Sequence, residues 1–200
     1  MKAIPLTPVG GGGICLADSA LQAADITVSA GTGLVSDGIR LGTSSDVSHA
    51  SLYAGDGNVV EAIGEGVVQR SLAKALDEDY LAVAYRVRGM TPSTAARIVH
   101  VAAQWKGKKY DTPGALEAGA RSLVLCVIVA CGAARAGAFK SSDKFYCSQL
   151  VLEAYRQAGA SFVTQDPNLS QPQDVVTAYS KGKLLYVGHL DSGEQDRRRT

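Results

Sequence analysis

The sequence predicts an α+β fold in which an antiparallel β-sheet packs against helices. The first half of the chain holds short β-rich segments, and the second half holds segments whose apolar residues recur at helical spacing. Neither an internal repeat nor a long linker interrupts the 200 residues. We therefore expect one domain over residues 1–200, with loose terminal segments at 1–13 and 192–200.

The strongest strand signal is a hairpin. Residues 48–54 and 58–63 flank Gly55-Asp56-Gly57, and this turn sequence is typical of tightly connected antiparallel strands. Further short segments are rich in β-branched residues or alternate between apolar and polar side chains. They lie at 24–28, 67–70, 81–87 and 183–187. Together these segments predict the antiparallel sheet.

Two helices have clear start or stop signals in the rest of the chain. Thr91 is a suitable N-cap with Pro92 at the first helical position, and the apolar stripe that follows continues up to Gly107. A second apolar stripe follows Cys147 and stops at Gly159. These helices supply the layer that covers the sheet.

Composition excludes several classes of function. Lys and Arg number 20 and Asp and Glu 19, so the formal charge of +1 offers no overall field for nucleic acid, and we expect no nucleic-acid partner. Pro5, Pro8 and four consecutive glycines interrupt the region where a signal peptide needs an unbroken apolar stretch. We therefore expect a cytoplasmic protein, with signal-independent secretion left open.

A charge-free apolar run extends from Ser122 to Ala134. It is shorter than the roughly 20 residues that span a bilayer, so no stable membrane span is expected. The simplest interpretation is a buried helix. The alternatives are a wall for an acyl chain or a segment at a membrane surface.

The four cysteines divide by context. Cys15, Cys126 and Cys131 show no metal-ligand spacing, and we interpret them as small core side chains; no metal site is expected. Cys147 differs because it begins a predicted helix, where unpaired N–H groups and the positive end of the dipole lower a thiol pKa. The structural alternative is that Cys147 or Ser148 serves only as the N-cap.

A reactive thiolate needs a base, and the chain offers three histidines. His100 lies beside the apolar stripe of a helix, and His189 lies near the end of the last predicted strand. His49 opens the hairpin, where a sheet can hold an imidazole rigidly against a thiolate. We therefore select His49 as the candidate base.

The hairpin also bears a candidate to orient the imidazole, Glu61. A three-residue loop at 55–57 places Glu61 diagonally across from His49 on one face of the sheet. A two-residue turn at 56–57 shifts the pairing by one and points Glu61 to the other face. Both registers remain open, and the substitutes for Glu61 are Asp46, Asp56 and Gln149.

The motifs carry a family resemblance. The stretch Ser48–Ala62, followed by Gly66-Val67-Val68 and Ser71-Leu72, bears the histidine, and Phe145-Tyr146-Cys147-Ser148-Gln149-Leu150-Val151 bears the cysteine. In this order they resemble the two halves of the circularly permuted NlpC-type cysteine hydrolases, the YiiX-like group. Weaker landmarks are Ala24-Asp25-Ile26, Tyr110-Asp111 and Pro172-Gln173-Asp174, so the resemblance covers most of residues 23–178.

This resemblance implies a permuted papain-like α+β fold, with an antiparallel sheet or half-barrel packed against helices. It implies Cys147 as nucleophile, His49 as general base and then acid, and Glu61 as orienting group. The backbone N–H of Cys147 is expected to hold an oxyanion. The second donor, or a substrate contact, is sought among Tyr53, Tyr146 and Gln149.

The implied chemistry is acyl transfer to the thiolate followed by hydrolysis, with no cofactor. The expected substrate is an amide bond in a peptide or a cell-wall peptide. The alternatives are an acyl-ester or lipid hydrolase or acyltransferase, and a non-catalytic papain-like module that binds such a ligand. Retention of the cysteine, the histidine and an acidic residue together favours an enzyme.

Overall fold

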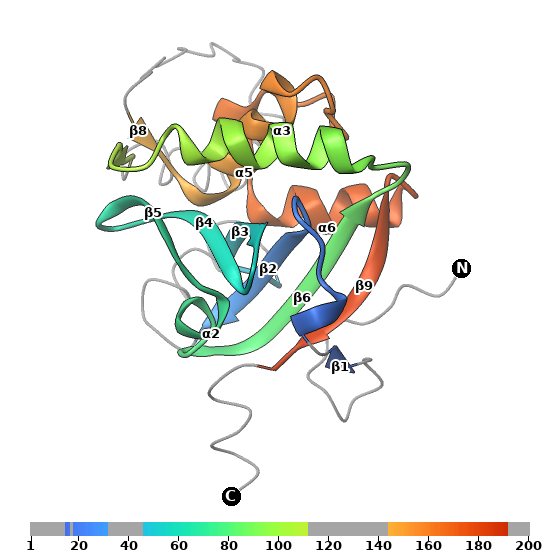
Figure 1. Cartoon of the computed structure of the whole chain (residues 1–200), viewed down its shortest axis with the longest axis horizontal. Coiled ribbons are helices and arrows are strands. Elements are labelled where there is room, and N and C mark those ends of the chain that lie inside the picture. Colours follow the sequence, from blue (N-terminus) through green and yellow to red (C-terminus); the bar gives the residue numbers. More distant parts are fainter. Residues whose placement is uncertain (1–14, 17, 32–45, 112–143, 192–200) are drawn as a thin grey trace, which may run out of the picture.

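The computed structural model describes residues 15–16, 18–31, 46–111 and 144–191. Within them an antiparallel sheet packs against helices, so the predicted α+β class is confirmed. Figure 1 shows helices α3, α5 and α6 together on one side of the molecule, with the strands extending away from them. The elements that bear the candidate site residues meet where α5 contacts β3 and β4.

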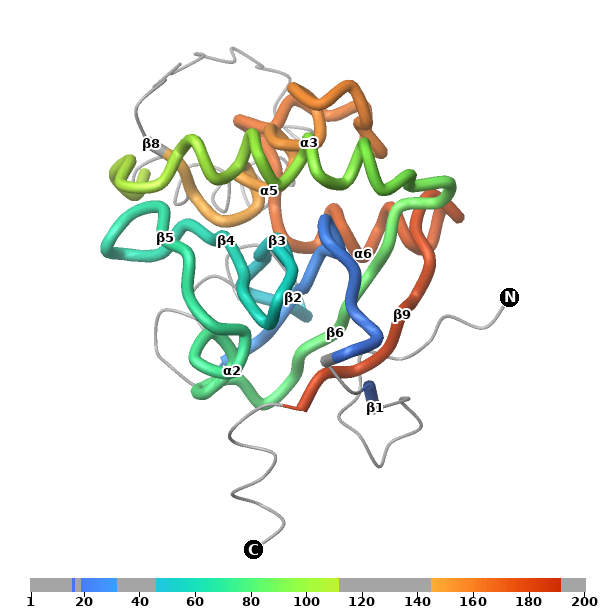
Figure 2. The backbone as a smooth tube through the Cα atoms, viewed as in Figure 1, coloured from blue at the N-terminus to red at the C-terminus, as the bar shows by residue number. Residues whose placement is uncertain are grey.

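The sheet described by the structure has seven strands in the order β1-β9-β6-β2-β3-β4-β5. Its neighbours run antiparallel except for the parallel pair β1 and β9, and β7 and β8 form a separate parallel pair. In Figure 2 the early strand β2 and the late strand β9 flank β6 from opposite sides. The strands are β1 Cys15–Leu16, β2 Ile26–Gly31, β3 His49–Gly55, β4 Asn58–Ile63, β5 Gly66–Ser71, β6 Asp79–Val87, β7 Lys109–Tyr110, β8 Lys144–Phe145 and β9 Leu184–Leu190.

Capping residues determine where the longer helices begin. The Thr91 side chain accepts a hydrogen bond from the Thr94 N–H (3.2 Å), and Pro92 takes the first position of α3 as predicted. The second predicted helix is α5, which is followed by Gly159 with a φ of 69°. The helices are α2 Leu72–Ala75, α3 Pro92–Ala103, α5 Cys147–Gln157 and α6 Pro172–Ser180, with 3₁₀ turns η1 Asp18–Ala20 and η2 Pro167–Leu169.

The sheet is buried on both faces. Alternate residues of β3 enter different clusters: Leu52 packs with Ile98 of α3 and Leu150 of α5, whereas Tyr53 packs with Leu72 of α2 on the other face. A strand buried on both faces has little freedom to move. The β3–β4 hairpin is therefore a rigid support for the side chains at its ends.

The hairpin combines the two registers considered above. Gly55 pairs with Asn58, so the turn is the two-residue Asp56-Gly57, and both turn residues have the positive φ of a type I′ turn (51° and 70°). A bulge at Ala54 then restores the pairing of Tyr53 with Val59. The turn is short, yet the strand register is that of the longer loop.

Several predicted boundaries change for local reasons. The strand expected from Ala24 begins at Ile26, because Ala24 has a φ of 67° and its carbonyl accepts a hydrogen bond from the Tyr155 hydroxyl. The helix expected to continue to Gly107 ends at Ala103, and the chain turns at Gly107 with a φ of 84°.

Other predictions lie outside the described residues. These are the apolar run 122–134 with its two cysteines and the terminal segments 1–13 and 192–200. Among the helices that the structure does describe, none is long and apolar enough to cross a membrane.

Candidate active site

The candidate nucleophile is the first residue of α5. Tyr146, in extended conformation, precedes the helix, so Cys147 lies in the turn whose backbone N–H groups have no intrahelical partner. The thiol is free and 5% exposed. Its side chain hydrogen-bonds the His49 ring, and the backbone N–H groups of Ala50 and Ser148 also donate to the sulfur.

His49 joins the thiol to Glu61. The His49 Nε2 donates to Glu61 Oε2 at 2.6 Å, which leaves Nδ1 as the ring nitrogen for Cys147. The side chain of His49 is 25% exposed, whereas that of Glu61 is 0% exposed. The structure thus brings Cys147, His49 and Glu61 together, and of the acidic candidates Glu61 is the one that bonds the imidazole.

The electrostatics of the three groups favour charge separation. Burial by itself raises the pKa of Cys147, but the hydrogen bond and positive charge of His49 and the two backbone N–H groups hold it below its ordinary value. For His49, burial lowers the pKa, and the bonds to Cys147 and Glu61 outweigh burial and raise it well above its usual range. The arrangement therefore favours a thiolate beside an imidazolium.

Two charged residues that the sequence analysis missed complete the surroundings of Glu61. Arg70 on β5 donates from Nε to Glu61 Oε1. Asp79, at the start of β6, interacts electrostatically with His49, Glu61 and Arg70. Its side chain also hydrogen-bonds Ser29. Burial raises the pKa of Asp79, while the two cations of the cluster act against the increase. The spacing of Glu61 and Arg70 on adjacent strands was the available signal for the first of these.

The residues suggested as oxyanion donors are engaged elsewhere. The Tyr146 hydroxyl donates to the Pro167 carbonyl at 3.1 Å. The Gln149 Oε1 accepts from the Tyr146 N–H at 3.3 Å, and its Nε2 donates to Asn168 Oδ1 at 2.8 Å. These bonds tie the start of α5 to η2, so both side chains support the helix that carries Cys147.

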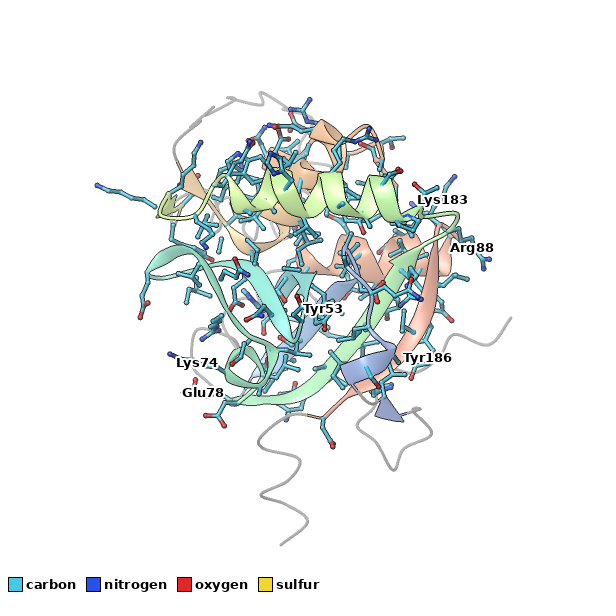
Figure 3. All side chains as sticks on the ribbon, in the orientation of Figure 1. Tyr53, Lys74, Glu78, Arg88, Lys183 and Tyr186 are labelled. Atoms are coloured by element: carbon cyan, nitrogen blue, oxygen red, sulfur yellow. The ribbon has the colours of Figure 1, made fainter. Side chains whose placement is uncertain are left out.

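Tyr53 lies at the other end of its strand. Its hydroxyl accepts from the Gly57 N–H at 2.9 Å in the hairpin turn. Tyr53 lies four positions after His49, which is about 13 Å along a strand. Figure 3 labels Tyr53 on the sheet, away from the exposed side chains Arg88 and Lys183 at the margin of the view. The structure does not bring Tyr53 to the thiol.

Tyr110 is a further residue near the thiol. The sequence analysis named it only as a landmark of the family resemblance. It lies on β7, paired with Phe145 of β8, two residues before Cys147. Burial raises its pKa, and the negative charge of Cys147 adds to the increase, so its hydroxyl stays neutral and able to donate. The bond from the Asp111 N–H to the Phe145 carbonyl (2.9 Å) fixes this segment beside the cysteine.

The remaining histidines lie apart from the thiol. His100 on α3 is exposed and its Nε2 lies 3.1 Å from Gln104 Nε2. His189 is buried in β9, and its Nδ1 shares a hydrogen bond of 2.6 Å with the Tyr186 hydroxyl. Both therefore have local structural partners, and His49 remains the candidate base.

A metal site needs several His, Cys, Asp or Glu side chains that converge on one point. No cluster of three or more His, Cys, Asp or Glu residues among the described residues is placed to hold a metal ion. Both oxygens of Glu61 are bonded, one of them to the cationic Arg70. This donor set does not fit a metal cation.

Comparison with known proteins places the chain in a family. It is 31% identical over 197 residues to the protein named "Probable lipoprotein peptidase YaeF" of Escherichia coli strain K12, covering 86% of this chain and 72% of YaeF. The chain belongs to the YaeF family. No family model matches it.

The fold of this YaeF-family chain also has a solved counterpart. The crystal structure of the metalloprotein YiiX from Escherichia coli O157:H7 superposes with a TM-score of 0.53. The two chains are 22% identical, and the match covers 86% of this chain and 89% of YiiX. This likeness shows a shared fold and agrees with the YiiX-like resemblance of the sequence.

Proposed function

We propose that the protein is a cysteine hydrolase that cleaves an amide bond in a peptide through an acyl-enzyme intermediate. The observation that carries the proposal is the continuous hydrogen-bonded series from Cys147 through His49 to Glu61, at the start of a helix. A thiol used only for packing has no need of an imidazole held by a buried carboxylate. The name of the relative YaeF, a peptidase, supports the same class of reaction.

The proposed roles follow from the contacts. The Cys147 thiolate attacks the carbonyl carbon, and the imidazolium of His49 gives its proton to the departing amine as the C–N bond breaks. The neutral His49 then takes a proton from water, whose oxygen attacks the thioester and releases the acid and the thiolate. Glu61 holds the ring orientation and stabilises the imidazolium throughout.

The oxyanion of each tetrahedral intermediate needs donors beside the sulfur. We assign one to the backbone N–H of Cys147 at the start of α5, where the helix dipole also favours negative charge. We assign the second to the neutral hydroxyl of Tyr110, which lies within the electrostatic field of Cys147. Tyr146 and Gln149 are held by other bonds and act through the position of the helix.

The finer family assignment is part of the proposal. The histidine strand precedes the cysteine helix in this chain, which supports a circularly permuted relation to NlpC-type and papain-like enzymes. Peptides, including cell-wall peptides, are the substrate class associated with that resemblance. An ester or lipid acyl group is the alternative, since the same acyl-enzyme chemistry serves both.

Alkylation of Cys147 by iodoacetamide across pH tests the mechanism without knowledge of the substrate. Because the pKa of Cys147 is lowered and that of His49 raised, labelling should begin below the ordinary thiol pKa of about 8.5. In His49→Ala the labelling midpoint should move up toward that value. A midpoint of about 8.5 in both proteins excludes the thiolate mechanism.

Substrate class requires a separate comparison. Peptide amides, cell-wall muropeptides and phospholipid esters are incubated with the protein and with Cys147→Ala, and products are identified by mass spectrometry. Cleavage of peptide amides that depends on Cys147 supports the proposal. Cleavage confined to phospholipids selects the alternative, and labelling without any turnover points to a binding module.

A further inference from the structure

Glu61 is a buried carboxylate with both oxygens engaged. Oε2 accepts from His49 at 2.6 Å, and Oε1 accepts from the Nε of Arg70 on the neighbouring strand β5. The Glu61 side chain is 0% exposed, while that of Arg70 is 26% exposed. A buried charge without a partner is costly, so the carboxylate depends on these two donors to remain ionised.

His49 alone does not balance the charge of Glu61 throughout the proposed reaction. In the proposed reaction its imidazolium gives a proton to the leaving group, and the ring is then neutral until water is activated. During that interval Glu61 faces an uncharged partner. Arginine side chains carry a permanent positive charge in proteins, so Arg70 offers Glu61 a cationic partner in every step.

We propose that Arg70 is a positioning residue of the site, which binds Oε1 of Glu61, leaves Oε2 for His49, and keeps the carboxylate ionised when the imidazole is neutral. The inference rests on the proposed function, because it explains how Glu61 serves a histidine that gains and loses a proton. Arg70 acts through Glu61 and His49 and is not itself a catalytic residue.

The charges that face Glu61 determine whether loss of Arg70 raises or lowers the pH at which the Cys147 thiolate forms. They are His49 on β3, Arg70 on β5 and Asp79 on β6, with Cys147 of α5 beyond the imidazole. Within this described cluster, Arg70 supplies the permanent positive charge of an arginine. Removing it makes every proton in the cluster bind more tightly, so formation of the Cys147 thiolate should require a higher pH.

The test is the pH dependence of iodoacetamide labelling of Cys147 in Arg70→Met and Arg70→Lys. We expect the midpoint in Arg70→Met to rise by roughly 0.5–1 pH unit, as follows from loss of a neighbouring opposite charge. Arg70→Lys keeps the charge and should recover most of the shift. Arg70→Gln, which is polar and neutral, should match Arg70→Met and guards against a packing defect specific to methionine.

Matched controls separate a local charge effect from general damage. Arg86→Met removes the partner of another buried carboxylate, and Arg88→Met removes an exposed arginine at the margin of Figure 3; neither should move the midpoint. Asp79→Asn removes a carboxyl group from the same cluster and should not raise it.

The outcomes distinguish this inference from the proposed function. A wild-type midpoint of about 8.5 that His49→Ala does not change overturns both. A low wild-type midpoint that is unchanged in Arg70→Met and Arg70→Gln overturns the role of Arg70 alone. An upward shift that Arg70→Lys fails to reduce, or that Arg86→Met reproduces, also overturns it.

Discussion

Two buried carboxylates in this protein are each paired with an arginine, and their surroundings differ. Asp25, which is 1% exposed, accepts from Arg86 at both oxygens (2.7 and 2.6 Å) and from the Gln22 N–H (2.8 Å). Glu61 gives one oxygen to Arg70 and the other to the imidazole of His49. The donors of Asp25 keep their protons at neutral pH, whereas one donor of Glu61 can lose its proton.

The two ion pairs differ in what their carboxylates contact. The Asp25–Arg86 pair closes the start of β2 against β6, where Arg86 also donates to the Ala20 carbonyl at 3.1 Å. Its value lies in holding chain segments together. The Glu61–Arg70 pair leaves one oxygen for a titratable group, and the bond from His49 to Glu61 helps to raise the pKa of His49.

Removing the negative charge of each carboxylate should give the largest difference in turnover between the two pairs. We expect Glu61→Gln to lower turnover about a thousandfold, because an amide neither stabilises the imidazolium nor accepts comfortably from Arg70. Acyl-enzyme formation with p-nitrophenyl acetate and cleavage of the peptide substrate measure this loss. Asp25→Asn should keep the activity per folded molecule, and an equal loss of turnover in both variants contradicts the division of roles.

Removing the arginine of the structural pair should act on stability. In Arg86→Met the buried Asp25 loses its partner, and we expect a decrease of about 3 kcal/mol in the free energy of unfolding. For a chain of this size the decrease corresponds to a fall of about 10 °C in Tm. Urea titration and thermal melts measure it, and a loss below about 0.5 kcal/mol would show that the pair is not structural.

Tyr110 offers a test of the reacting side of the molecule that leaves both ion pairs intact. Tyr110→Phe should lower kcat about a hundredfold if the hydroxyl stabilises the oxyanion. Since the thiolate itself is unaffected, the midpoint of iodoacetamide labelling should stay within about 0.3 pH unit of wild type. Unchanged kcat removes Tyr110 from the mechanism, and Tyr186→Phe on β9 serves as a hydroxyl-deletion control.

The smallest expected effect on stability and kcat comes from the backbone contact that supports the segment leading to Tyr110. Gly66 has a φ of 114°, and a Cβ at this position overlaps the Lys108 carbonyl oxygen. The Val67 N–H donates to the Lys108 carbonyl (2.8 Å) and the Val67 carbonyl accepts from the Gly107 N–H (2.9 Å), so this contact aligns β5 with the approach to Tyr110. Gly66→Ala should cost about 2 kcal/mol and lower kcat, measured by urea titration and p-nitrophenyl acetate turnover.

Gly64 is the matched position for that substitution. It lies in the same turn, its φ is not positive, and a Cβ there meets nothing within 4 Å. Gly64→Ala should leave stability within about 0.5 kcal/mol of wild type. Equal losses at both glycines would mean that the turn, and not the approach to Lys108, is responsible.

The core of the candidate site could be selected from the sequence because its members occupy recognisable local positions. Cys147 begins a helical stripe, and His49 and Glu61 lie on the arms of a hairpin with a clear turn signal. The pairing register was not available in the same way. It depends on a bulge at Ala54, and no local composition distinguishes that alanine from an ordinary strand residue.

Residues contributed from distant elements were beyond local reasoning. Asp79 reaches the cluster because β6 pairs with β2, and β2 pairs in turn with the strand of His49. Gln149 was considered as a donor because it follows the thiol, yet its amide is held by Asn168 of η2. Tertiary packing determines these contacts, and the pattern and spacing of residues in the sequence do not predict it.

One missed element did carry a local signal. Helix α6 begins with Pro172 at its first position, and Asp174 Oδ2 accepts from the Gln171 N–H at 2.7 Å. Proline followed by an acidic residue in the first turn is a typical helix start. With the buried residues Val175 and Ala178 three positions apart, the helix was open to prediction.

The bulge at Ala54 makes the two arms of the hairpin unequal in the deletions they tolerate. A chain lacking Ala54 would retain the pairs Gly55–Asn58 and Tyr53–Val59, and His49 would still meet Glu61. A chain lacking Val59 would move Glu61 opposite Leu52, on the face turned away from His49. A one-residue deletion is therefore compatible with the His49–Glu61 contact on one arm of the hairpin and incompatible with it on the other.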